Sequence, residues 1–121
     1  MIVAVLISCL NADASKVNLL KMKATAYCIQ GTTSTGIKTR KGICATGNSE
    51  WVGKTVVIYQ RLPNEKVGDI IGIYEIEDTG CKPDVIDVWY PTLDECQGFM
   101  NRVYEDGCKG KIYVQILDAE G

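Results

Sequence analysis

The sequence TVVIY at residues 55–59 places β-branched and aromatic side chains at consecutive positions. Such residues are enriched in strands, and an unbroken run of them is typical of a strand buried on both faces. A chain of 121 residues has room for one domain of ordinary size. We therefore predict a strand over residues 55–59 at the centre of a single hydrophobic core.

Strand patterns continue on both sides of this segment. Polar and apolar side chains alternate between Lys21 and Cys28, which is the period of two expected of a half-buried strand. The predicted strands cover residues 22–28, 42–45, 55–59, 70–76, 85–90 and 111–117. The segment Glu77–Gly80 (EDTG) is predicted to be the turn that ends the fourth strand, and Leu62–Gly68 a connecting loop.

One helix is predicted. Thr92 and Glu95 have the spacing of a capping box, apolar residues then recur at helical spacing, and Gly107 ends the pattern. Six short strands with one short helix before the last strand predict a mainly β fold, a small barrel or sandwich.

Composition excludes several classes of function. A net charge of -2 and a pI near 5.1 lack the basic surface needed for sequence-independent nucleic-acid binding, so we expect no nucleic-acid partner. The chain has no histidine, which excludes Ser-His and Cys-His relays and removes the commonest metal ligand. We expect neither a metal nor a cofactor, and any catalysis must use carboxylates or thiols.

Residues 1–14 are predicted to be a leader, followed by a single domain over residues 15–121. The apolar run Ile2–Leu10 precedes Ala12–Ala14, an A-x-A-like site typical of secretory signals. Two alternatives remain: a lipoprotein box with Cys9 as the lipidated residue, or a buried first strand. The run is too short to span a bilayer as a helix, so we expect no stable membrane insertion.

Six cysteines in 121 residues is a high density. Removal of the leader leaves Cys28, Cys44, Cys81, Cys96 and Cys108. In an exported chain this density predicts at least one intramolecular disulfide, although the spacing does not select a connectivity.

Several short motifs occur in a characteristic order between residues 22 and 118. They are Ala24–Tyr27, Ser34–Gly36, Gly42–Ala45, Glu77–Gly80, Ile86–Trp89 and Val114–Leu117. In this order they resemble the bacterial 3D domain, named for three aspartates. That family is similar to the catalytic domain of membrane-bound lytic transglycosylase A and to stationary-phase secreted muralytic proteins. The resemblance implies a six-stranded double-psi β-barrel that cleaves peptidoglycan glycan strands.

The resemblance also implies roles for individual residues. The second and third aspartates of the family correspond to Asp78 and Asp87, while Thr46 stands at the position of the first, so one of the three is missing. Asp78 and Asp87 are the predicted catalytic residues. Substrate contacts are predicted at Tyr27, Thr46, Thr79, Gly80 and Trp89.

A lytic transglycosylase needs only one carboxyl for proton transfer, because the substrate's own C6 hydroxyl is the nucleophile. Asp87 is expected to act first as acid and then as base, with its pKa raised by apolar neighbours. The resemblance implies a monomeric, secreted or envelope protein of a bacterium or a phage. The alternative is a glycan-binding or structural envelope module with a degenerate site. A groove shared by Asp78 and Asp87 favours the enzyme, and a buried salt bridge to either carboxylate favours the alternative.

Overall fold

The computed structural model describes residues 18–118, so the leader predicted over residues 1–14 and the lipid anchor considered at Cys9 lie outside the described residues. The strands are β1 (Leu20–Tyr27), β2 (Ile43–Thr46), β3 (Thr55–Arg61), β4 (Val67–Thr79), β5 (Val85–Trp89) and β6 (Lys111–Leu117). The helices are α2 (Leu93–Tyr104) and the short 3-10 helices η2 (Ser49–Trp51), η3 (Pro63–Glu65) and η4 (Glu105–Gly107). The prediction of a mainly β fold with one short α-helix before the last strand is confirmed.

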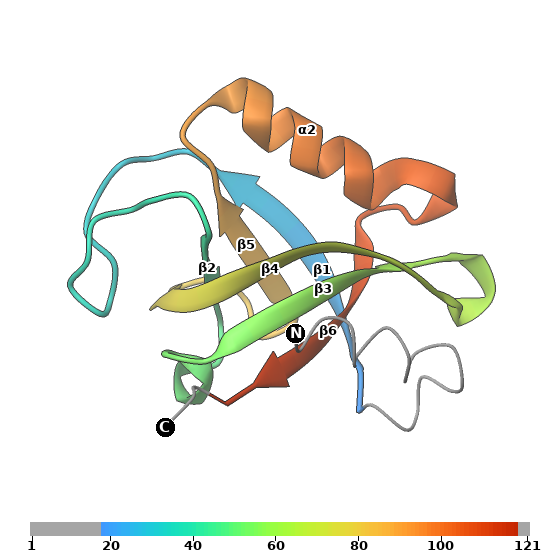
Figure 1. Ribbon diagram of the computed structural model, residues 1–121, viewed down its shortest axis with the longest axis horizontal. Helices are drawn as coiled ribbons and strands as arrows, with labels where there is room; N and C mark the ends of the chain where they lie inside the picture. Colours follow the sequence, from blue (N-terminus) through green and yellow to red (C-terminus); the bar gives the residue numbers. More distant parts are fainter. Residues whose placement is uncertain (1–17, 119–121) are drawn as a thin grey trace.

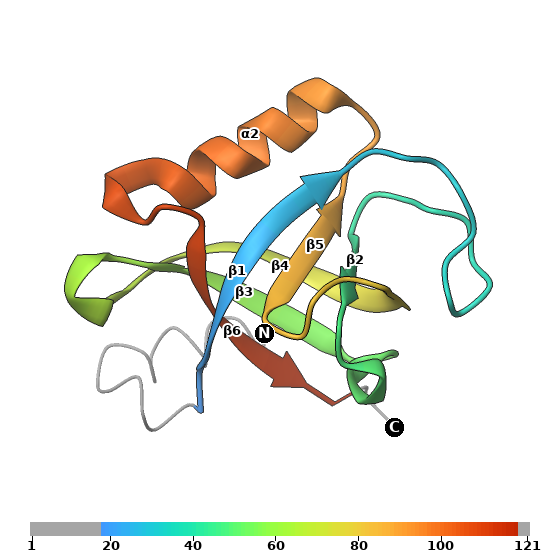
Figure 2. The same cartoon turned by 180° about the vertical axis from the view of Figure 1, so that it is seen from behind.

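The strands close into a barrel in the order β1-β5-β2-β4-β3-β6 (Figures 1 and 2). Two neighbouring pairs are parallel, β1 with β5 and β2 with β4, and the other four are antiparallel. If β1 is exchanged with β4, β2 with β5 and β3 with β6, both the order of the strands around the closed barrel and their directions stay the same. This two-fold arrangement is that of the double-psi barrel, and the predicted six-stranded barrel is confirmed.

Strand β3 is buried on both faces, as its sequence predicts. The side chains of Val56 and Ile58 lie in the main core, while Val57 and Tyr59 belong to a second apolar cluster with Tyr113. All four β3 residues are fully buried. Because successive side chains of β3 point to opposite faces, the strand contributes apolar side chains both to the barrel interior and to an outer apolar layer.

Helix α2 lies along the side of the barrel, beside β1 (Figures 1 and 2). The hydroxyl of Thr92 accepts a hydrogen bond from the backbone N–H of Glu95 at 3.1 Å, which confirms the predicted cap. Cys96, Phe99 and Val103 form its buried face. Within residues 18–118, no helix has both the length and the apolar character to cross a bilayer.

Two predicted loops are partly strand. The turn predicted over Glu77–Gly80 is wrong, because β4 continues to Thr79, which pairs with Thr46 of β2. The connection predicted over Leu62–Gly68 is shorter, since β4 already begins at Val67. In both places, pairing with a neighbouring strand outweighs the local preference of polar residues and glycine for turns.

The predicted disulfide is not present among the described residues, whose five cysteines are free thiols. Cys44, Cys96 and Cys108 are buried, and burial raises the pKa of each thiol. Cys28 lies beside Cys96 without a disulfide between them. The prediction from cysteine density is wrong because three of these side chains serve as small apolar packing residues.

Gly47 allows the connection after β2 to pass against the backbone that follows β4. A Cβ atom at Gly47 would overlap the main chain of Lys82 and Pro83. We expect Gly47→Ala to lower the free energy of unfolding by about 1–3 kcal/mol, because backbone must move to admit the methyl group. Urea denaturation followed by circular dichroism measures this change.

Gly98→Ala is the matched control. Gly98 lies inside α2, and a Cβ there meets nothing within 4 Å. The same substitution is expected to stabilise the protein by about 0.5–1 kcal/mol, the helix preference of alanine over glycine. Equal effects of the two substitutions would contradict the close approach at Gly47.

Candidate active site

Strand β4 contains a β-bulge where it pairs with β2. Cys44 pairs with Ile76, but the next residue, Ala45, pairs with Asp78, so Glu77 is an extra residue in β4. Side chains alternate along a strand, and Ile76 points into the barrel core. Without the extra residue, Asp78 would point inward as well. The bulge instead directs Asp78 to the outer face of the barrel.

Asp87 of β5 lies on the same face. It pairs with Ala45 on one side and with Thr25 of β1 on the other. Thr25, Asp87, Ala45 and Asp78 thus form one row across β1, β5, β2 and β4, and cross-strand partners share a face. The backbones at Asp87 and Asp78 are two strand spacings apart, roughly 9.5 Å. The register therefore brings the two predicted catalytic carboxylates together.

The Asp87 carboxyl is half-buried and has one hydrogen-bond donor among residues 18–118. The hydroxyl of Thr25 donates to Asp87 Oδ1 at 2.7 Å. Loss of solvation raises the pKa of Asp87 above its usual value, and the bond from Thr25 offsets part of that rise. No ion pair to Asp87 or Asp78 exists within the part of the chain that the structure describes. Asp87 is therefore the carboxyl better suited to hold a proton.

The Asp78 carboxylate is fixed by three donors. Oδ1 accepts hydrogen bonds from the backbone N–H of Ser34 at 3.0 Å, from the Ser34 hydroxyl at 2.7 Å and from the N–H of Thr79 at 2.9 Å. Ser34 lies in the long connection between β1 and β2. This connection contributes directly to the position of the second carboxylate.

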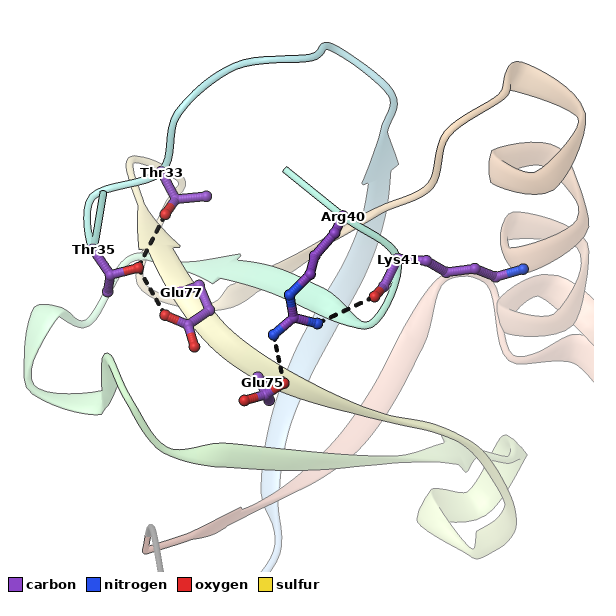
Figure 3. A network of polar contacts seen from close by, with 6 residues as sticks. All are labelled: Thr33, Thr35, Arg40, Lys41, Glu75 and Glu77. Carbon is purple, nitrogen blue, oxygen red and sulfur yellow. Dashed lines mark hydrogen bonds and ion pairs between the residues drawn. The ribbon is translucent and has the colours of Figure 1, made fainter. Parts of the chain in front are cut away.

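Further contacts hold the connection between β1 and β2 against β4, as Figure 3 shows, and against α2. The Thr35 hydroxyl donates to Glu77 at 2.7 Å, and the Arg40 guanidinium donates to Glu75 at 2.7 Å. Lys41 forms an ion pair with Glu95 at 2.7 Å. The extra residue of the bulge, Glu77, thus carries the hydrogen bond that holds the connection next to Asp78.

Tyr27 contributes a hydroxyl close to both carboxylates. Its oxygen is buried and has no hydrogen-bond partner among residues 18–118. Burial raises the pKa of Tyr27 to about 12, and the charges of Asp78 and Asp87 add to the rise. The phenol therefore keeps its proton at neutral pH.

Two of the predicted substrate contacts, Trp89 and Thr46, are buried in this structure. Trp89 is 4% exposed, and its indole N–H donates to the carbonyl of Ile29, so its ring is not available to stack on a sugar. Thr46 is fully buried because it pairs with Ile86, whose side chain lies in the core. A carboxylate at position 46 would be buried too, so an aspartate introduced there would destabilise the barrel.

Thr79 and Gly80 remain accessible next to Asp78. The Thr79 hydroxyl lies 3.0 Å from the Ser34 hydroxyl, and Gly80 is exposed with a φ of 117°. That backbone conformation is unfavourable for residues with a Cβ atom, which explains a glycine at this position. Substrate contact at these two residues stays a prediction.

Sequence reasoning missed Thr25 and Ser34. Thr25 was visible as a polar residue in an alternating strand, and Ser34 as part of the segment Ser34–Gly36. Neither signal indicates a contact with a particular aspartate. Those contacts depend on the order of the strands in the barrel and on the path of the connection between β1 and β2.

An open hollow of about 490 Å³ lies in the connection between β1 and β2, and neither Asp78 nor Asp87 lines it. Its lining residues are Gln30, Gly31, Thr32, Lys38 and Thr39. In the described part of the chain, no group of three or more cysteine, aspartate or glutamate side chains could hold a metal ion.

The raised pKa of Asp87 makes stability depend on pH. The folded protein binds the Asp87 proton more tightly than the unfolded chain does, in which aspartates titrate at about pH 3.9. Stability contributed by Asp87 therefore falls as the pH rises from that value through the higher folded pKa. In the Asp87→Asn variant the side chain does not ionise, so this loss of stability does not occur. Its amide oxygen can still accept the hydrogen bond from Thr25. We expect the variant to have a higher melting temperature than the wild type at neutral pH.

The advantage of Asp87→Asn should shrink as the pH falls below about 4, where the wild-type carboxyl is protonated in both states. Melting temperatures measured between acidic and neutral pH test this. Asp69→Asn, at an exposed position of β4, is the control and should change stability little. An Asp87→Asn variant that is less stable than the wild type at neutral pH would contradict the half-buried carboxyl described above.

Comparison with known proteins gives no relative: the chain matches no family model, no curated protein and no solved structure. The function is therefore inferred from the side chains and their geometry.

Proposed function

We propose that this protein cleaves the glycan strands of peptidoglycan as a lytic transglycosylase. The observation that carries the proposal is the half-buried Asp87, whose pKa is raised, on the same barrel face as a second carboxylate. Neither carboxylate is paired with a cation among the described residues. A carboxyl that acts as an acid at neutral pH needs a raised pKa, so that it still carries the proton it transfers.

The proposed reaction uses Asp87 twice. Its proton goes to the oxygen that links N-acetylmuramic acid to the next sugar, and the bond between that oxygen and C1 of the muramic acid breaks. The C6 hydroxyl of the same ring then attacks C1, and Asp87 accepts the hydroxyl proton. A 1,6-anhydro ring forms, no water is consumed, and Asp87 is protonated again.

Positive charge develops on the sugar ring as the bond breaks. In this proposal, Asp78 stabilises that charge, because its carboxylate is held in place by Ser34 and Thr79. Tyr27 is a substrate contact in this proposal; because its hydroxyl is buried, the side chain must move to donate to a substrate oxygen. Thr25 positions the Asp87 carboxyl for transfer.

The setting proposed with this activity is the envelope of a bacterium, reached by secretion from a bacterial or a phage-encoded gene. The protein would act there as a monomer on peptidoglycan. A second candidate is a glycan-binding or structural envelope module. It is favoured by the buried Thr46, which leaves no carboxylate at the first of the three aspartate positions.

A digest of purified peptidoglycan separates these functions. We expect the wild type to release muropeptides that are lighter by one water than hydrolytic products, as mass spectrometry detects. Asp87→Asn should lose activity by about 100-fold or more, because no other group replaces the acid. Asp69→Asn, which removes an exposed carboxylate of β4, should retain activity.

Products with a free reducing end would identify a hydrolase instead. Binding of the wild type to peptidoglycan without any release would favour the module. Full activity of Asp87→Asn would refute the assignment of the acid.

A further inference from the structure

Three basic residues lie in a row on the outer face of the barrel, across β1, β6 and β3. Lys23 of β1 pairs directly with Lys111 of β6. Gln60 of β3 pairs with Ile112 of β6, so Arg61 and Lys111 are the next residues of these two strands. Like charges directly opposite each other on neighbouring strands are unfavourable.

Arg61 is the most unusual member of this row. Only 9% of the residue is exposed, and its Nε has no hydrogen-bond partner among residues 18–118. Its guanidinium lies over the ring of Tyr113, 5.8 Å from the centroid, and no described carboxylate forms an ion pair with it. Glu65 is a described carboxylate that interacts with Arg61, and it is shared with Lys21 and Lys111. A largely buried cation that shares its counter-ion with two others favours a further anionic partner.

A cavity of about 310 Å³ lies at this position. Two turns form it, Leu62–Glu65 and Gly107–Lys109, together with Arg61 and Lys111. It therefore presents three cationic side chains and one carboxylate, Glu65. That carboxylate already forms an ion pair with Lys21, which leaves the cavity with an excess of positive charge.

The acidic residue nearest to the second turn does not remove this excess. Asp106 accepts a hydrogen bond from Gln60 at 3.4 Å and does not line the cavity. The turns themselves adopt unusual backbone conformations: Asn64, Glu65 and Lys109 have positive φ angles, between 58° and 66°, as does the neighbouring Asp106 at 56°. Non-glycine residues in this region are strained, and such strain concentrates at functional sites.

We propose that this cavity binds a phosphoryl group. A phosphate monoester carries about 1.5 to 2 negative charges at neutral pH, which matches an excess of two or more cations better than a carboxylate does. The planar guanidinium of Arg61, which lines the cavity, suits two phosphate oxygens at once. Lys109 and Lys111 supply further charge from the rim. This site shares no lining residue with the carboxylates of the proposed active site.

Inorganic phosphate is the first probe, with sodium chloride and sodium acetate at equal ionic strength as comparisons. Amide resonances of the whole protein are followed by ¹H–¹⁵N NMR during the titration. We expect saturable shifts for residues 62–66 and 106–111 with phosphate, and much weaker changes with chloride or acetate. The measurement is independent of glycan cleavage, so it stands if the proposed enzymatic activity fails.

Charge-removing variants assign the site. Lys109 and Lys111 are exposed, so the double variant Lys109→Gln, Lys111→Gln should fold and should weaken phosphate binding by about 10-fold or more. Arg61→Lys keeps the charge but loses the planar fork, and should also weaken binding. Lys66→Gln is the control, because Lys66 is exposed next to the same turn but does not line the cavity.

The phosphoryl group can come from a soluble monoester or from a lipid headgroup. Co-sedimentation with phosphatidylcholine vesicles containing phosphatidic acid distinguishes the two sources: pelleting identifies the headgroup, and binding of free phosphate without pelleting identifies a soluble ligand. Absence of binding in both arms overturns the proposal. So does a loss of affinity in Lys66→Gln equal to that of the double variant.

Discussion

The extra residue Glu77 determines which way the end of β4 faces. Up to Ile76 the strand alternates in register with β2, and after the bulge Asp78 takes the outward position beside Ala45. Asp87 already occupies that face from the other side of β2. The hydrogen bond from Thr35 to Glu77 then holds the connection between β1 and β2 beside the bulge. One additional residue thus aligns two carboxylates and positions the segment beside them.

Burial without ion pairing gives the site its chemical character. A surface carboxylate is ionised at neutral pH, and one paired with a cation is held ionised more strongly still. Asp87 has neither environment, since it is half-buried and its hydrogen bond comes from the neutral hydroxyl of Thr25. The closed barrel supports this arrangement because Asp87 lies between two paired neighbours, on β1 and β2. Cationic side chains gather elsewhere, in the cavity that Arg61, Lys109 and Lys111 line.

Alternating side chains were sufficient to predict the strands, and the spacing of Thr92 and Glu95 was sufficient to predict the start of α2. The bulge was not predictable, because Glu77–Gly80 has the composition of a turn, and only pairing with β2 makes most of it strand. The sequence also could not show whether the side chain of Trp89 is exposed or buried. An aromatic residue in a strand can stack on a ligand or pack under a loop, and here the loop covers it.

Backbone NMR of the parallel pair formed by β2 and β4 tests the central claim, that the bulge puts Asp78 and Asp87 on one face. The account predicts inter-strand nuclear Overhauser effects that connect Cys44 with Ile76 and Ala45 with Asp78. Contacts that connect Ala45 with Glu77 instead would show a regular strand, with Asp78 directed into the barrel. That result would contradict the shared site.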